Sequence, residues 1–279
     1  MHPRTASATL LSCLLAVAAA PPAAADDEIL SVMRAMNDDL KAMWMDYRIE
    51  SIDYLAVGQG RPSDRLLRQP FRWVAGDARR RAEAGRLSFL VDGSWGERTA
   101  SGVPAAATAA AIGEAVATWA ADPCLGLEVV ERAWDGGDVT VSDFFMAGGP
   151  LGDPFAADIV FGGWLAGDDF LFGPETLAVA VTYVFVDRAS GEPTDVDRDG
   201  HLDVALAEIY FNDGFPWSIA GGGIDIRTAA LHETGHALDL GHFGSPPEAV
   251  MNPVYDGPRH ALEPIDHAGL CTVWSVHQH

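Results

Sequence analysis

The segment HETGHALDLGH, which ends at His242, constrains the fold more than any other part of this 279-residue chain. His232 and His236 are four residues apart, so a helix would place both imidazoles on one face, within reach of one metal ion. Glu233 would lie beside that ion, outside the set of ligands. The helix must then end before His242 if a third imidazole is to turn back, and Gly241 supplies a break. The pattern predicts a zinc site with three protein ligands and an open fourth position.

Such a site suits hydrolysis. Zinc lowers the pKa of a bound water and polarises a carbonyl, while Glu233 takes the proton as general base. The alternative is a helix that merely carries solvent-facing histidines. Chance would place this arrangement in about one of two thousand chains of similar composition, so we favour the zinc site.

The start of the chain resembles an export signal. A short basic stretch, an apolar run and small residues precede the first acids, which predicts a signal peptide over residues 1–25 and a secreted or periplasmic protein. A lipid anchor at Cys13 is disfavoured because the apolar run continues past it. No later segment is long and apolar enough to span a membrane, so we expect no membrane insertion after signal removal.

The charge of the chain excludes some partners. Loss of residues 1–25 removes one Arg and no acid, which moves the formal charge from -22 to -23. This acidity argues against nucleic acid and against anionic membrane surfaces, and it is compatible with bound calcium.

Two regions follow the signal. We predict that residues 26–86 are an N-terminal extension or pro-region, with a helical pattern over residues 29–44 and an exposed loop at residues 58–65. Residues 87–279 are expected to form the catalytic domain, as a monomer.

The main domain mixes strands and helices. A helix after Val103 has an inner face of Ile112, Val116 and Trp119, and Asp225 is the expected N-cap of the site helix. A terminal helix is expected over residues 263–276. This order indicates an α+β or mixed α/β domain. The expected strands cover residues 87–91, 127–131, 139–141, 158–161, 177–186 and 206–211.

The zinc motif resembles the signature of the metzincin zinc proteases, and in particular their matrixin branch. In AVMNPVY, Met251 matches the methionine beneath the zinc, and Pro253 to Tyr255 match the wall of a substrate pocket. Only the zinc motif with this Met-turn is highly specific. Weaker matches to matrixin strands and helices extend the resemblance over roughly residues 85 to 276, at residues 110–122, 157–164, 173–180, 207–213 and 264–274.

The resemblance implies an α+β fold with a mixed, mostly parallel twisted sheet, a site helix and a C-terminal helix. It also implies a secreted zinc metalloendopeptidase that binds a protein or peptide substrate in extended form. The substrate edge would be the strand that carries Leu177, Ala178 and Ala180. The alternative is an exported zinc- and calcium-binding protein with the same fold and no turnover.

The chain departs from the family pattern in three ways. Asp239 stands where the family has glycine, so the helix either ends there in a left-handed turn or continues to Gly241. Val179 and Tyr210 occupy places where many matrixins bind a structural zinc, so a second zinc is not expected. No cysteine-switch sequence precedes the domain.

The residues also indicate a candidate calcium loop and a candidate disulfide. The acids of DVDRDGHLD stand at positions one, three, five and nine of an EF-hand-like loop, which makes the loop a candidate calcium site or, alternatively, a solvated acidic turn. Its twelfth position is Leu206, so the bidentate glutamate is missing. These acids are Asp195, Asp197, Asp199 and Asp203. In an exported chain, Cys124 and Cys271 are more often a disulfide than two free thiols.

Overall fold

The computed structural model of the protein describes residues 22–57, 70–80, 85–93, 101–142, 145, 151–153, 155–166 and 173–274. Most of the expected signal peptide lies outside these ranges, although the first described helix, α1 (Pro22–Ala42), begins within it. None of the helices in the described ranges is both long and apolar enough to cross a membrane.

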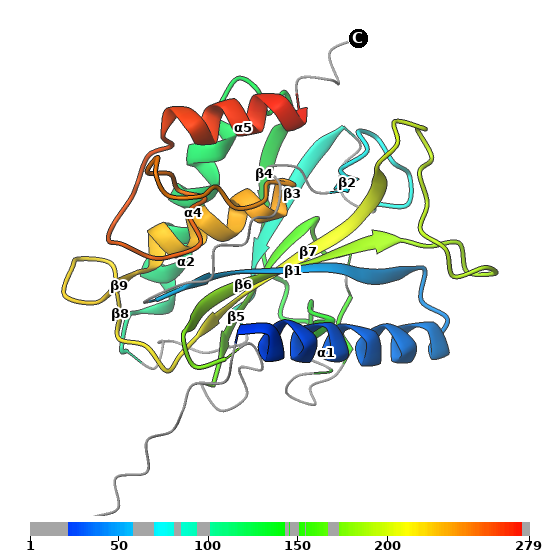
Figure 1. Cartoon of the computed structure of the whole chain (residues 1–279), viewed down its shortest axis with the longest axis horizontal. Coiled ribbons are helices and arrows are strands. Elements are labelled where there is room, and N and C mark those ends of the chain that lie inside the picture. The colour runs from blue at the N-terminus through cyan, green and yellow to red at the C-terminus, as the bar shows by residue number, and fades with distance from the viewer. Residues whose placement is uncertain are drawn as a thin grey trace, which may run out of the picture.

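The fold is built on one mixed sheet (Figure 1). Its four parallel pairings and two antiparallel pairings confirm the expected α+β fold with a mostly parallel sheet. The short β2 (Phe71–Arg72) pairs with β7 beside the main path. Along that path the strands are β1 (Tyr47–Ala56), β6 (Thr176–Phe185), β7 (Leu202–Asn212), β5 (Ile159–Leu165), β3 (Arg86–Val91) and β4 (Glu128–Arg132).

Helices cover both faces of the sheet, so its central strands are apolar on both sides (Figure 1). Every residue of β6 is buried. Ala180 and Val184 pack in the larger core, which also receives apolar side chains from the helices α2 (Ala105–Ala120), α4 (Ile226–Ala237) and α5 (Pro264–Trp274). Val181 and Tyr183 face the other way and pack with the apolar side chains of α1.

Two hydrogen bonds fix the site helix α4 in place. Asp225 is its N-cap, as expected, and the carboxylate accepts a hydrogen bond from the Thr228 N–H at 2.7 Å. The fully buried Trp119 on α2 donates its indole N–H to the Leu231 carbonyl at 2.7 Å. The short strands β8 (Trp217–Ser218) and β9 (Ile224–Asp225) lead into this helix.

One strand assignment from the sequence was wrong, and the strand β1 was missed. Residues 139–141 do not form a strand, because the backbone N–H groups of Val141 and Ser142 donate to the buried carboxylate of Glu208 and not to a neighbouring strand. The extension also contributes β1, which was not expected. The other expected strands are present with boundaries that shift by up to four residues, and the terminal helix covers Pro264–Trp274.

Two helical glycines give a matched test of packing. A Cβ at Gly235 on α4 would lie 2.2 Å from Met251 Sδ, whereas a Cβ at Gly113 on α2 would meet nothing within 4 Å. We expect Gly113→Ala to stabilise the protein by up to about 1 kcal/mol through helix propensity. We expect Gly235→Ala to destabilise it by about 1–3 kcal/mol through overpacking. Urea unfolding of both variants measures the difference, and a stabilised Gly235→Ala variant would show that Met251 does not pack as described.

Candidate metal centre and substrate cleft

The three histidines of the motif converge on one point. Their Nε2 atoms are 3.0 Å apart between His232 and His236, 3.1 Å apart between His236 and His242, and 3.2 Å apart between His232 and His242. Three nitrogens around one tetrahedral zinc would be separated by about 3.3 Å, given zinc–nitrogen bonds of about 2.0–2.1 Å. The separations therefore fit three ligands of a single ion.

The hydrogen bonds of the rings fix which nitrogen faces the centre. His232 Nδ1 lies 2.7 Å from the Val250 carbonyl and His236 Nδ1 lies 2.8 Å from the Leu240 carbonyl. A carbonyl only accepts hydrogen bonds, so each Nδ1 carries the proton and each neutral ring turns an Nε2 lone pair inward. Burial holds the pKa of both rings well below the ordinary value for histidine, which favours the neutral form. Lone pairs that face one another need a cation between them, and zinc fits this donor set.

The end of α4 brings the third histidine back. Asp239 has φ 69°, and the N–H groups of Asp239 and Leu240 donate to the carbonyls of His236 and Gly235. This is a Schellman turn with Asp239 in the left-handed position usually held by glycine. The helix therefore ends before Asp239 and does not continue to Gly241, and the chain returns His242 to the centre.

The side chain of Asp239 points into the protein. Its Oδ2 accepts a hydrogen bond from the Trp73 N–H at 3.3 Å, while its Oδ1 has no hydrogen-bond partner within the described part of the chain. Burial raises the pKa of this carboxyl well above the ordinary value for aspartate, and the nearby Arg72 acts in the opposite direction. Trp73 also donates its indole N–H to the Ala237 carbonyl at 2.7 Å, so the segment around Trp73 packs against the end of the site helix.

The Met-turn packs against the site helix. Met251 is fully buried and packs against Gly235, and Val250 supplies the carbonyl that orients His232. The backbone N–H groups of Val250 and Met251 donate to the buried carboxylate of Asp266 on α5, at 2.9 Å and 3.1 Å respectively. Asp266 is therefore a positioning residue that the sequence analysis missed.

Glu233 lies beside the three histidines in the cleft. Its carboxylate is completely buried, and Oε1 accepts a hydrogen bond from the Leu55 N–H at 3.0 Å. Its Oε2 has no hydrogen-bond partner among the residues that the structure describes. Burial raises the pKa of Glu233 well above the ordinary value for glutamate. A carboxyl group with one free oxygen and a raised pKa can exchange a proton with a water or an amine beside the metal.

The expected substrate edge is not open. Leu177, Ala178 and Ala180 are fully buried, because β1 pairs antiparallel with β6 along this edge. The main-chain groups of β6 on this side already bond a strand from the extension, so the predicted substrate edge is occupied within the chain. β1 also touches the opposite wall, where Ala56 N–H donates to the Pro253 carbonyl and Tyr255 N–H donates to the Ala56 carbonyl.

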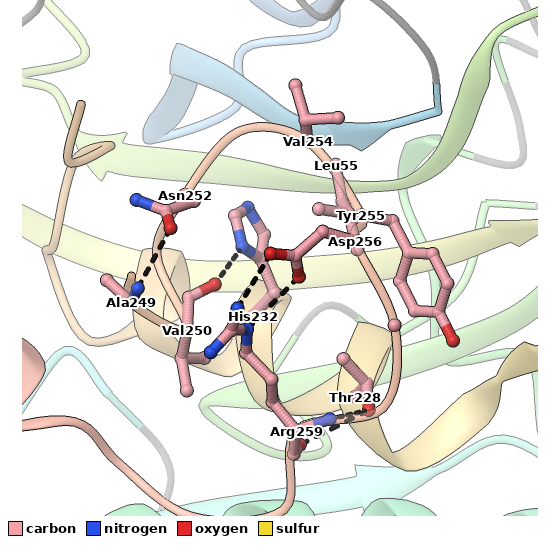
Figure 2. A pocket seen from close by; sticks show the side chains of 11 residues that line it. Leu55, Thr228, His232, Ala249, Val250, Asn252, Val254, Tyr255, Asp256 and Arg259 are labelled. Carbon is pink, nitrogen blue, oxygen red and sulfur yellow. Dashed lines mark hydrogen bonds and ion pairs between the residues drawn. The ribbon is translucent and has the colours of Figure 1, made fainter. Parts of the chain in front are cut away.

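A pocket lies next to the metal centre (Figure 2). Leu55 contributes to it, is 2% exposed, and shares the lining with the loop that carries Val254 and Tyr255. Only about 10 Å³ remains free in this pocket, which is about the smallest space that holds a water molecule. Tyr255 is thus a wall residue, and its hydroxyl also accepts a hydrogen bond from the Asp225 N–H at 3.1 Å.

The acidic loop gathers three of its four expected ligands. Carboxylate oxygens of Asp195, Asp197 and Asp203 lie within 4.8 Å of one another. Asp199 turns away, and its carboxylate lies 3.3 Å from Arg72. Asp203 already accepts from Arg79 at 2.7 Å, so a cation here would share this ligand with an arginine.

The two cysteines of the main domain are joined. The structure places a disulfide between Cys124, after α2, and Cys271 on α5, across 147 residues of chain. This bond links the terminal helix to the end of α2. It leaves both sulfurs unavailable as metal ligands, although Asp122 and His267 lie nearby.

Together, the site helix, the returning third histidine and the buried methionine have the arrangement of a metzincin metal site. Comparison with known proteins narrows the class. Residues 159–275 match the matrixin family model, and this part of the chain is matrixin-like. The match begins at β5 and continues through the metal centre to the terminal helix.

Individual relatives agree with the family match. The chain is 39% identical over 74 residues to human Matrix metalloproteinase-19, which is 25% of this chain and 14% of that protein. It is 38% identical over 71 residues to human Matrix metalloproteinase-25, which is 23% of this chain and 12% of that protein. It is 36% identical over 85 residues to Karilysin of Tannerella forsythia, which is 30% of this chain and 16% of that protein. The chain thus spans less than a fifth of the length of these relatives.

Sequence reasoning missed the residues of β1 that enter the cleft. Leu55 contacts Glu233 and the pocket, and the Tyr54 carbonyl hydrogen-bonds the His242 ring. The only signal in the sequence is the short alternation of Tyr47 and Ile49 with charged residues. The preceding helical pattern masked this alternation.

The backbone at Asp239 gives a second prediction. Asp239→Gly and Asp239→Ala both remove the carboxylate and its bond to Trp73, so they differ only in tolerance of the left-handed turn. We expect the glycine variant to be more stable than the alanine variant by about 1–2 kcal/mol. Urea unfolding measures this difference. Equal stabilities would mean that residue 239 does not adopt a left-handed conformation.

Proposed function

We propose that the chain is an exported zinc metalloendopeptidase. The observation that carries this proposal is the convergence of three neutral imidazoles on one point, with the carboxylate of Glu233 beside them. His232, His236 and His242 would hold the zinc, and Met251 would support them. Export rests on the signal-like start of the sequence.

The chemistry divides between the ion and the chain. When bound, zinc would polarise the scissile carbonyl and lower the pKa of a water. Glu233 would accept the proton of that water and return it to the leaving amine, a role that its free Oε2 and raised pKa support. The Val250 and Leu240 carbonyls would keep the ligand rings in the metal-binding tautomer.

An extended protein or peptide substrate suits this cleft. The cleft lies between the main chain of β6 and the segment from Pro253 to Tyr255, and both offer backbone groups to an inserted strand. Main-chain pairing of this kind orients a peptide without regard to its side chains. The pocket beside His232 would then select the side chain that follows the cut, and its Leu55 occupant points to a medium-sized apolar residue.

A second function is favoured by one observation. Because β1 fills the cleft, the protein could be an exported zinc- and calcium-binding protein that presents this fold without turnover. Such a protein would bind zinc at the same three histidines. Only hydrolysis separates the two functions.

The catalytic role of Glu233 gives the decisive prediction. Glu233→Ala should bind zinc in the same 1:1 ratio and lose hydrolysis of a peptide library by a factor of about 10²–10⁴, since general acid–base catalysis contributes that much. Mass spectrometry detects the cleaved peptides. All chains in this experiment also carry Leu55→Ala, which weakens the binding of β1 in the cleft.

Glu131→Ala, an exposed change on β4, is the matched control and should keep full activity. Cleavage that survives Glu233→Ala would refute the mechanism. Absence of cleavage in every zinc-loaded chain would favour the binding protein.

We also propose calcium at the acidic loop, on the three carboxylates of Asp195, Asp197 and Asp203. Saturating calcium should raise the free energy of unfolding by about 1–3 kcal/mol, since a ligand at a hundred times its Kd contributes about 2.7 kcal/mol. Asp197→Asn should abolish this increase, while Asp138→Asn, an exposed change elsewhere, should retain it. Thermal unfolding with and without calcium tests the site, and an unchanged Tm in the parent chain would leave the loop a solvated turn.

A further inference from the structure

The strand β1 lies in the cleft in the manner of a bound peptide. We propose that residues 47–57 are a built-in occupant of the substrate cleft, presented to the site as a substrate is, and that they exclude other peptides until they leave. This inference rests on the proposed function, because it assigns that cleft its regulation and its first cleavage site. Four groups of contacts support it.

The first group is the main-chain pairing. Leu55 is registered opposite Ala178 in the antiparallel ladder with β6, and Ala56 forms a parallel bridge with Val254 on the other wall. Ala56 uses both its N–H and its carbonyl on that wall. The strand is therefore bonded on both sides, as an extended peptide inserted into this cleft would be.

The second group is the position of one peptide bond. The Leu55 N–H donates to Glu233 Oε1 at 3.0 Å, and the Tyr54 carbonyl hydrogen-bonds the ring of His242. The two ends of the Tyr54–Leu55 peptide group are thus held by the general base and by a metal ligand. The nitrogen that would leave thus lies within hydrogen-bond distance of the group that would protonate it.

The third contact is the side chain of Leu55. It is 2% exposed and lines the pocket with His232, Val254 and Tyr255 (Figure 2). The pocket has room for about one water molecule beside it. A substrate residue that needs this pocket cannot enter while Leu55 remains.

The fourth group anchors the occupant outside the cleft. Asn37 on α1 holds Ile49 with two hydrogen bonds, from Asn37 Nδ2 to the Ile49 carbonyl at 2.9 Å and from the Ile49 N–H to Asn37 Oδ1 at 2.7 Å. Leu40 and Tyr47 are buried beside them. The start of β1 is thus tied to α1, and a tethered segment competes at an effective concentration of the order of millimolar.

The bond so presented can be cut by the chain itself. Water adds its oxygen to the carbonyl carbon of Tyr54, the C–N bond to Leu55 breaks, and the proton passes through Glu233 to the amine of Leu55. The products are a carboxylate at Tyr54 and a new N-terminus at Leu55. Separation of the two ends would release the ladder on each side and open the cleft.

A binding experiment tests the occupancy without any turnover. All chains carry Glu233→Gln, which abolishes the base but keeps a side-chain oxygen for the Leu55 N–H. The probe is a fluorescein-labelled synthetic peptide, YRIESIDYLAV, and its binding to zinc-loaded chain is measured by fluorescence polarisation. We expect Leu55→Ala to bind the probe at least tenfold more tightly than the parent, because its pocket is free.

The matched control is Leu30→Ala, which makes the same change at an exposed site on α1 and should bind the probe like the parent. Ala56→Pro is a second variant, because proline removes the N–H that donates to the Pro253 carbonyl. Equal affinity in all four chains would overturn the proposal that β1 occupies the peptide site.

The same chains with Glu233 restored separate this inference from the proposed function. Tight probe binding by Leu55→Ala without hydrolysis would refute the peptidase and leave the occupancy standing. Hydrolysis at equal rates by the parent and by Leu55→Ala, with β1 intact by mass, would refute the occupancy and leave the peptidase standing. In the zinc-loaded parent, mass spectrometry should find a fragment that begins at Leu55 and is absent from Glu233→Gln; a first cut elsewhere would contradict the substrate-like orientation.

Discussion

The convergence of three imidazole rings is the interaction on which the rest of this structure depends. Two of the rings are fixed by carbonyls that can only accept a proton from Nδ1, so their Nε2 atoms have no proton to place between them. Buried together without a cation, these lone pairs repel one another. This donor set suits a metal ion at this point, and zinc matches the ligand type and spacing.

The backbone around the site provides those carbonyls. Leu240 presents its carbonyl to His236 because the chain reverses at Asp239, and Val250 presents its carbonyl to His232 because the Met-turn lies beneath the helix. Asp266 in turn holds the Met-turn through two N–H groups. A carboxylate on the terminal helix thus orients a metal ligand on the site helix through one loop, which is how outer groups commonly position ligands.

The sequence predicted that the three histidines meet, because the information for this is local. Spacings of four and six residues within one helix and one turn determine where His232, His236 and His242 lie. It left open how the helix ends at Asp239, because both Asp239 and Gly241 are able to end it, and the contact of the Asp239 carboxylate with Trp73 spans 166 residues of chain that local spacing does not reveal. The failed strand at residues 139–141 has the same cause: Glu208, a buried acid on a distant strand, takes the N–H groups that a sheet would use.

The strand β1 was the largest omission, and its reason is physical. An edge strand with two apolar faces leaves a row of unpaired N–H and carbonyl groups, which either a partner strand or a ligand must satisfy. Without β1, β6 would be such an edge, and β1 supplies the partner for its main-chain groups on that side. A cleft that binds extended peptides needs an edge of this kind. The same edge can also pair with a strand of its own chain that reaches it. The feature that suits β6 for substrate binding therefore also suits it for inhibition from within, provided that the occupying strand can be released.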